Sequence, residues 1–195
     1  MPFAFEEALG YMFSVVHDKD GISAAFVFLQ MMADCTHKNG ELLDVLDENY
    51  QLLGYFEEKN GYYISNSPEL TKQVFNSIRS VSEKSDQPYP KSIGNFTITS
   101  WRDLTTGYDS TTPDRRPVLP VSSSSQMITC VAEDARDPTK IARFTLRGSG
   151  TEPKLKVYIE ARGKTRESAR ECAETMWELL QGQWFKPKTT GLRLP

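Results

Sequence analysis

Two runs near the end of the chain alternate strictly between apolar and polar residues. In the first run Ala142, Phe144 and Leu146 alternate with Arg143, Thr145 and Arg147, and in the second Leu155, Val157, Ile159 and Ala161 alternate with Lys154, Lys156, Tyr158 and Glu160. A period of two is typical of a strand with one buried face. The pattern predicts two strands joined by a loop at residues 147–153, Arg-Gly-Ser-Gly-Thr-Glu-Pro, which Pro153 ends sharply.

Four segments carry apolar residues at helical spacing, and three of them begin at a residue suited to cap a helix. We expect helices over residues 18–37, over 41–53, from 67 to about 81, and from 165 to a stop at Gly182. Asp20, Ser67 and Thr165 offer side-chain oxygens to the free amides of a first turn. The first helix is apolar on most sides, which predicts burial between layers; its apolar residues are Ile22, Ala25, Phe26, Phe28, Leu29, Met31, Met32 and Ala33.

Shorter strand patterns complete the second half of the chain. Residues 54–65 predict a pair of strands turned at Asn60-Gly61, and residues 95–99 and 126–132 predict single strands. Residues 107–120 predict a turn-rich loop, and 183–195 an extended tail. Strands mixed with helices in this order indicate an α+β domain. We place a domain boundary near Asn66, which divides the chain into 1–66 and 67–195.

The loop at 147–153 carries the strongest candidate chemistry. Arg147 supplies a planar fork that matches a phosphate or carboxylate, and the two glycines allow main-chain amides to turn toward an anion. Ser149 and Thr151 add hydroxyl donors, and Lys156 shares the face of Arg147 if the strands pair as a hairpin. The pattern predicts a pocket for a dianion, most plausibly a phosphate. The alternative is an ordinary turn in which Arg147 is a solvated charge.

Composition excludes several classes of protein. The chain of 195 residues has a net charge of −3 and 38% hydrophobic residues, so it resembles a globular protein without a basic surface for nucleic acid. No apolar run is long enough to span a membrane, and the N-terminus lacks the pattern of a secretory signal. Cys35, Cys130 and Cys172 are odd in number and widely spaced, which favours the reducing cytoplasm.

The loop run resembles the phosphate-binding loop in the fourth domain of the α-D-phosphohexomutase superfamily, which includes phosphoglucomutases and phosphomannomutases. Residues 5–10, Phe-Glu-Glu-Ala-Leu-Gly, resemble the sugar-binding loop of the third domain, and residues 18–21, Asp-Lys-Asp-Gly, resemble the segment that follows it. Residues 102–109, Arg-Asp-Leu-Thr-Thr-Gly-Tyr-Asp, and 125–129, Ser-Gln-Met-Ile-Thr, are similar to the phosphopentomutase and phosphoglucomutase-2 branch. The resemblance covers nearly the whole chain.

The resemblance implies a fold and a set of site residues. It implies an α/β remnant, the end of the third domain, followed by an α+β fourth domain with a mainly antiparallel sheet and helices on one face. Arg147, Ser149, Gly150, Thr151 and Lys156 would grip the phosphate of the substrate that lies far from the reacting group. Glu6 and Glu7 would bind sugar hydroxyls. Ala8 stands where the family often has a serine, which is compatible with a pentose substrate.

Lys19 has two interpretations. Its flanking acids Asp18 and Asp20 suggest a surface salt bridge worth little. The resemblance instead places it in the active cleft, as an acid–base group or a phosphate contact.

The chain contains neither the Ser-His motif whose serine carries the phosphoryl group nor the Asp-x-Asp-x-Asp metal loop of the family. We therefore interpret it as the C-terminal, substrate-binding part of a phosphosugar mutase, an isomerase that is inactive by itself, and we assign no metal ligand to it. Mg²⁺ and a sugar bisphosphate activator belong to the parent family, and the expected partner is a ribose or glucose phosphate. Two alternatives stay open: a sugar-1,6-bisphosphate synthase of the same branch, and a non-catalytic phosphosugar-binding module.

Overall fold

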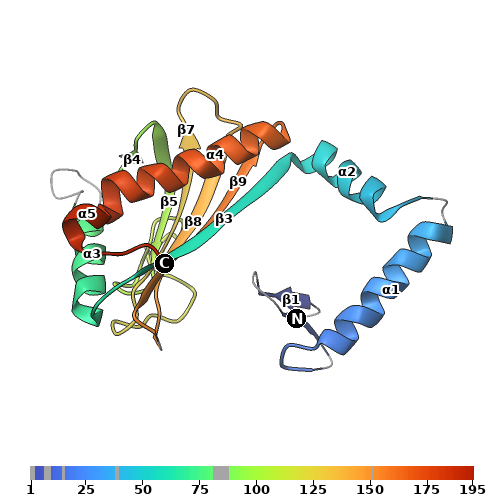
Figure 1. The fold of residues 1–195 in the computed structure, drawn as a ribbon, viewed down its shortest axis with the longest axis horizontal. Helices are drawn as coiled ribbons and strands as arrows, with labels where there is room; N and C mark the ends of the chain where they lie inside the picture. Colours follow the sequence, from blue (N-terminus) through green and yellow to red (C-terminus); the bar gives the residue numbers. More distant parts are fainter. Residues whose placement is uncertain (1–2, 7–9, 15, 38–39, 81–87, 151) are drawn as a thin grey trace. The chain divides into compact units, whose positions relative to one another are not determined.

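The computed structural model describes residues 3–6, 10–14, 16–37, 40–80, 88–150 and 152–195. These residues form two compact units, Met1–Leu53 and Gly54–Pro195. Figure 1 labels the elements of each unit along the chain.

The first unit begins with a small hairpin and continues with two helices. Strand β1 (Phe3–Phe5) pairs antiparallel with β2 (Tyr11–Phe13), and the helices are α1 (Gly21–His37) and α2 (Leu42–Leu53). Asp20 caps α1 as predicted, because its Oδ1 accepts hydrogen bonds from the amides of Ile22 at 3.0 Å and Ser23 at 3.1 Å.

Helix α1 is not buried between layers in this chain. None of its residues is buried, and Ile22 and Phe26 are 86% and 71% exposed. The predicted helix is therefore present, but no other described element buries its apolar residues.

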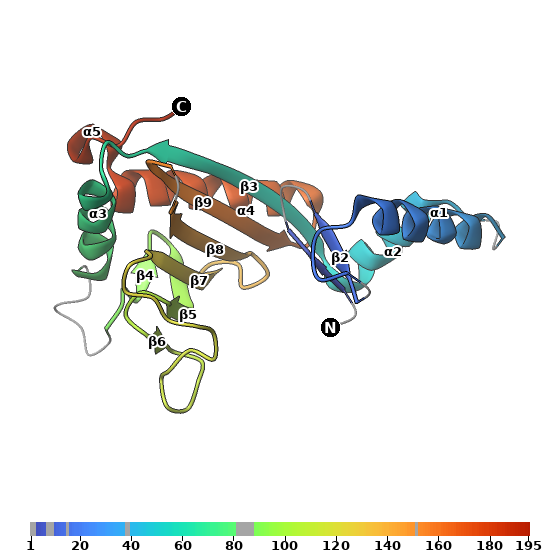
Figure 2. The same cartoon turned by 90° about the horizontal axis from the view of Figure 1, so that it is seen from below.

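The second unit is built on one antiparallel sheet, with strands in the order β3-β9-β8-β7-β5-β4 and with β6 paired to β5. Figure 2 shows these strands side by side. The strands are β3 (Tyr55–Ile64), β4 (Ser92–Ile93), β5 (Phe96–Asp103), β6 (Tyr108–Asp109), β7 (Met127–Asp134), β8 (Ile141–Gly148) and β9 (Lys154–Gly163). The two alternating runs of the sequence are β8 and β9, paired as a hairpin as predicted.

Helices α3 and α4 of the second unit start where the sequence predicts. The hydroxyl of Ser67 accepts from the amide of Leu70 at 3.1 Å, at the start of α3 (Pro68–Ser80). Thr165 and Ser168 form a capping box before α4 (Arg166–Leu179), which lies across the sheet in Figure 1. The chain then forms η1 (Leu180–Phe185) and α5 (Pro187–Thr190).

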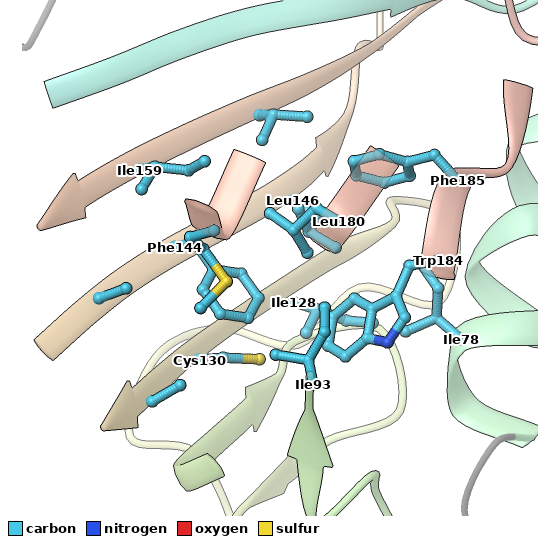
Figure 3. Close-up of a cluster of buried hydrophobic side chains, with 14 of the residues drawn as sticks. Ile78, Ile93, Ile128, Cys130, Phe144, Leu146, Ile159, Leu180, Trp184 and Phe185 are labelled. Carbon is cyan, nitrogen blue, oxygen red and sulfur yellow. The ribbon is translucent and has the colours of Figure 1, made fainter. Parts of the chain in front are cut away.

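Apolar residues from the strands and the helices form one core on the helix-covered face of the sheet, as Figure 3 shows. Ile128, Phe144 and Ile159 from the sheet meet Ile78 of α3 and Leu180 of η1, and all are at most 1% exposed. Each such side chain contributes about 1.5–3 kcal/mol through burial. The core confirms the predicted antiparallel sheet with helices on one face.

The strand pair predicted at 54–65 is wrong. Residues 55–64 form one continuous strand, β3, which pairs with β9 along its whole length. Asn60 accepts a hydrogen bond through Oδ1 from the amide of Ile159 at 3.1 Å, and Gly61 lies under the ring of Trp177. Tertiary contacts therefore hold Asn60-Gly61 in an extended strand, although an Asn-Gly pair commonly forms a turn.

The division of the chain falls between Leu53 and Gly54 rather than near Asn66, because β3 belongs to the sheet of the second unit. The assignment of the two units to a third and a fourth mutase domain stays a proposal.

The predicted extended tail is also wrong. Gly182 lies inside η1, and Trp184, Phe185 and Leu192 are at most 4% exposed. Arg193 forms an antiparallel bridge with Ile64, the last residue of β3. Apolar burial thus holds the last residues on the domain.

Candidate functional site

The loop between β8 and β9 is closed by its own main chain. The amide of Ser149 donates to the carbonyl of Lys154 at 2.8 Å, and the amide of Lys154 donates to the carbonyl of Glu152 at 2.7 Å. The amide of Glu152 donates to the hydroxyl oxygen of Ser149 at 3.3 Å. The hydroxyl of Ser149 therefore accepts a hydrogen bond within the loop, and a hydroxyl that accepts can also donate.

Two cations stand side by side at the mouth of the loop. Arg147 of β8 lies directly opposite Lys156 of β9 in the register of the hairpin. Leu146 and Leu155 point into the core, so the two cations lie on the other face of the sheet. Arg147 is exposed and Lys156 is half-buried. Two adjacent positive charges favour an anion at this point.

The backbone contribution to this site is smaller than the glycine pattern predicts. The amides of Gly148 and Ser149 are used within the sheet, where they donate to Gln126 at 2.9 Å and to Lys154 at 2.8 Å. Gly150 lies beyond these bonds, and a Cβ placed on it would meet no atom within 4 Å. Gly150 is exposed, whereas Thr151 lies outside the described residues.

The start of α3 lies beside the loop. The amide of Ser65 donates to the carbonyl of Pro153 at 2.8 Å. A Cβ on Gly148 would lie 3.4 Å from Thr71 of α3 and 3.4 Å from Gln126. A side chain at position 148 would therefore contact both neighbours, which shows how closely the loop packs on Thr71 and Gln126.

Lys154 is not a free cation. Its Nζ pairs with Glu152 at 3.3 Å and lies 4.5 Å from the centre of the Tyr62 ring. These contacts leave Arg147 and Lys156 as the cations of the loop mouth.

The first unit brings together two residues that the sequence analysis named separately. Lys19 Nζ pairs with Glu6 Oε2 at 2.5 Å, and the two side chains are 52% and 63% exposed. The stem of Lys19 crosses Gly10, whose φ is +140° and whose place leaves no room for a Cβ. Lys19 therefore pairs with Glu6, and not with the acids that flank it in sequence. Glu7 lies outside the described residues.

Sequence reasoning missed a largely buried ion pair that is linked to the loop at 147–153 through Gln126. Arg79 binds Asp103 through Nε at 2.6 Å and Nη2 at 3.2 Å, and Arg79 Nη1 donates to Gln126 at 2.9 Å. Asp103 and Gln126 belong to the two motifs at 102–109 and 125–129, which we had noted without assigning them to a site. No signal in the sequence marks Arg79, because it is a single basic residue in the last turn of a helix.

The described part of the chain contains no group of three or more His, Cys, Asp or Glu placed to hold a metal ion. Among the described helices, none has the length and apolar character needed to cross a membrane.

The comparisons with known proteins agree on one family. The family described as phosphoglucomutase/phosphomannomutase, C-terminal domain, matches residues 131–179. A phosphoribomutase of Saccharomyces cerevisiae is 48% identical over 193 residues, which are 96% of this chain and 31% of that protein. A human glucose 1,6-bisphosphate synthase is 42% identical over 159 residues, 81% of this chain and 24% of that protein.

A solved structure shares the fold. The structure of pp63/parafusin, a phosphoglucomutase from Paramecium, matches with a TM-score of 0.58 at 16% identity, over 100% of this chain and 32% of that chain. The chain thus spans about a third or less of the length of each of these relatives. The family model and the 48% identity to phosphoribomutase agree, and the chain belongs to the phosphoglucomutase/phosphomannomutase family, of which it carries the C-terminal domain.

Proposed function

We propose that this chain is the substrate-binding C-terminal part of a phosphosugar mutase that interconverts 1-phospho and terminal-phospho sugars, acting on ribose or glucose phosphates. The loop at 147–153 binds the phosphate that is not being transferred. The observation that carries the proposal is the placement of Arg147 directly opposite Lys156 at the mouth of a glycine-containing loop. The identity to phosphoribomutase supports a pentose phosphate as the substrate.

The donors at the loop suit a phosphate dianion. The guanidinium of Arg147 offers two parallel donors, Lys156 adds a point charge, and the hydroxyl of Ser149 and the amide of Gly150 add neutral donors. Thr151 belongs to the same set through the family resemblance. Binding the remote phosphate orients the sugar and contributes binding energy to the reaction at its other end.

Glu6 accepts hydrogen bonds from sugar hydroxyls, with Glu7 beside it in sequence. A carboxylate suits this task because it is an acceptor only and has two oxygens. Lys19 pairs with Glu6 at 2.5 Å, so a sugar that binds Glu6 would compete with an exposed ion pair. That competition costs little, because exposed pairs are worth about 1 kcal/mol or less. Lys19 is then released to serve as an acid–base group or a phosphate contact.

The 195-residue chain by itself should show no mutase turnover. Its sequence has no Ser-His phosphoserine motif and no Asp-x-Asp-x-Asp metal loop. Among the described residues no group of His, Cys, Asp or Glu is placed to hold Mg²⁺, so we assign no metal ligand to this chain. Turnover by the pure chain, abolished by Arg147→Ala, would contradict this.

The test is a thermal melt of the chain with and without ribose 5-phosphate. A ligand that binds only the native state raises Tm. The shift should be lost in Arg147→Ala and kept in Arg143→Ala, a matched control on the same strand and the same face, where Arg143 lies opposite Glu160. No shift for the wild-type chain, or equal shifts in both variants, would overturn the proposal. Either result would favour a structural or interaction domain over a phosphosugar-binding one.

A second candidate is a sugar-1,6-bisphosphate synthase, favoured by the 42% identity to the human glucose 1,6-bisphosphate synthase. The same loop would hold the phosphate of the acceptor sugar in either reaction. The complete protein separates the two: a synthase requires a second phosphoryl donor for turnover, whereas a mutase turns over without one. If the loop binds phosphate but the complete protein catalyses neither reaction, the chain is a phosphosugar-binding module.

We also propose a cytoplasmic location. The three cysteines Cys35, Cys130 and Cys172 are all free thiols, and the last two are buried. Free thiols are typical of a reducing compartment.

A further inference from the structure

We infer that the two motifs at 102–109 and 125–129 form a scaffold that fixes the phosphate loop, with Thr105 and Gln126 as positioning residues. The inference rests on the proposed function of the loop. Neither residue contacts the ligand in this proposal, and both act through the main chain of Gly148.

The hydroxyl of Thr105 clamps the chain on both sides of Gln126. It donates to the carbonyl of Ser125 at 2.9 Å and accepts from the amide of Met127 at 3.0 Å. One hydroxyl therefore uses both its donor and its acceptor to fix three consecutive residues.

Gln126 passes this constraint on to the phosphate loop. Its carbonyl accepts from the amide of Gly148 at 2.9 Å, and Met127 lies opposite Arg147 in the register of β7 and β8. Its Cβ lies 3.4 Å from the place of a Cβ on Gly148. The first two residues of the loop thus rest on Gln126 and Met127.

The ion pair of Arg79 and Asp103 supports both positioning residues. Arg79 grips Asp103 at 2.6 and 3.2 Å and donates to Oε1 of Gln126 at 2.9 Å. Asp103 Oδ1 also accepts from the amides of Thr105 at 2.9 Å and Thr106 at 3.2 Å. The side chain of Asp103 is only 2% exposed. Asp103 therefore fixes Gln126 by two routes, through Thr105 and through Arg79.

The hydrogen bonds that run from Asp103 through Thr105 and Gln126 end at the main chain of Gly148, and not in the apolar core. The charge of Arg79 is matched by Asp103, so Arg79 supports the loop and is not a free cation for the ligand. Donors held in place before binding lose less freedom when the ligand arrives. Removing hydrogen bonds of the scaffold should therefore lower the affinity for phosphate more than it lowers the stability of the fold.

The test compares Thr105→Val, which removes the hydroxyl at nearly constant shape, with Thr105→Ser, which keeps it. Titration calorimetry of the chain with ribose 5-phosphate should show an affinity about fivefold weaker in Thr105→Val, because both hydrogen bonds of the hydroxyl, to Ser125 and from Met127, are lost. Hydrogen exchange at Gly148 should accelerate while amides in the middle of β8 keep their rates, and Thr105→Ser should match the wild type. Unchanged affinity in Thr105→Val, or acceleration shared by all of β8, would overturn the inference.

Gln126→Leu provides a second readout if Thr105→Val does not fold. It removes the contact with Arg79 but keeps the carbonyl that binds Gly148, so a smaller loss of affinity is expected, and no loss refutes the inference. Arg147→Ala separates the two proposals. If Arg147→Ala binds like the wild type, or the wild-type chain does not bind, the proposed function fails and this inference with it. If only Arg147→Ala loses affinity, the positioning role alone is wrong.

Discussion

Gly61 lies in the middle of β3, where an added methyl group would collide with Trp177. A Cβ at this position would be 2.6 Å from Cη2 and 3.2 Å from Cζ3 of the indole ring. The ring has little room to retreat, since it stacks on Tyr63 with centroids 6.0 Å apart and planes 10° apart. Lys59 Nζ lies 5.8 Å from the centre of the same ring.

The collision gives Gly61→Ala two opposing effects. Overpacking a well-packed site costs about 1–3 kcal/mol. Replacing glycine by alanine in a strand recovers about 0.5–1 kcal/mol, because the unfolded chain loses freedom. We therefore expect Gly61→Ala to lower the free energy of unfolding by about 1 kcal/mol and Gly61→Val by about 3 kcal/mol.

Urea denaturation measures both variants against Gly182→Ala, a control whose Cβ would meet no atom within 4 Å. The control should be neutral or stabilising. Trp177→Leu should relieve the collision, so that the double variant with Gly61→Ala is about 1 kcal/mol more stable than the sum of the single changes. If Gly61→Ala is as stable as the wild type, or does not couple to Trp177, the packing argument for a continuous β3 is refuted.

Three further predictions concern ionisable groups. Asp103→Asn should lower the free energy of unfolding by about 2–4 kcal/mol, because it removes the negative charge that matches Arg79 at a largely buried site; equal urea midpoints would contradict this. Burial raises the pKa of the Cys172 thiol from 9.0 to about 12. Between these values the unfolded chain releases a proton that the folded chain keeps, so stability should fall by up to about 1.4 kcal/mol per pH unit. Alkaline denaturation should show a shallower fall in Cys172→Ala, and an identical slope would count against the burial. Glu6→Gln should change the free energy of unfolding by less than about 1 kcal/mol, because its ion pair with Lys19 is exposed; a clear loss of Tm would show that the pair is structural.

Much of the fold was predictable because the relevant signals are local. The hairpin of β8 and β9, the caps at Asp20, Ser67 and Thr165, and the antiparallel α+β class follow from periodicity and from side chains near their own amides. The opposition of Arg147 and Lys156 also follows once the hairpin is known, since register places them on one face. These features depend on neighbours close along the chain.

The failures share one physical cause, which is that distant residues override a local preference. The pair Asn60-Gly61 predicts a turn by its local sequence. Pairing with β9 and packing against the ring of Trp177 instead hold it in a strand. Gly182 reads as a stop, but the burial of Trp184 and Phe185 carries the helix past it.

The sequence alone determined the chemical groups of the loop at 147–153 and the two strands that present them. The alternation of apolar and polar residues and the positions of the glycines are both properties of consecutive residues. Only the tertiary structure decided which amides remain for a ligand and what lies beneath the loop. The carboxylate of Asp103 and the guanidinium of Arg79 come from a strand and a helix, and no local pattern pairs them. Their pairing depends on the burial of both elements against one core, which makes an unmatched charge there costly.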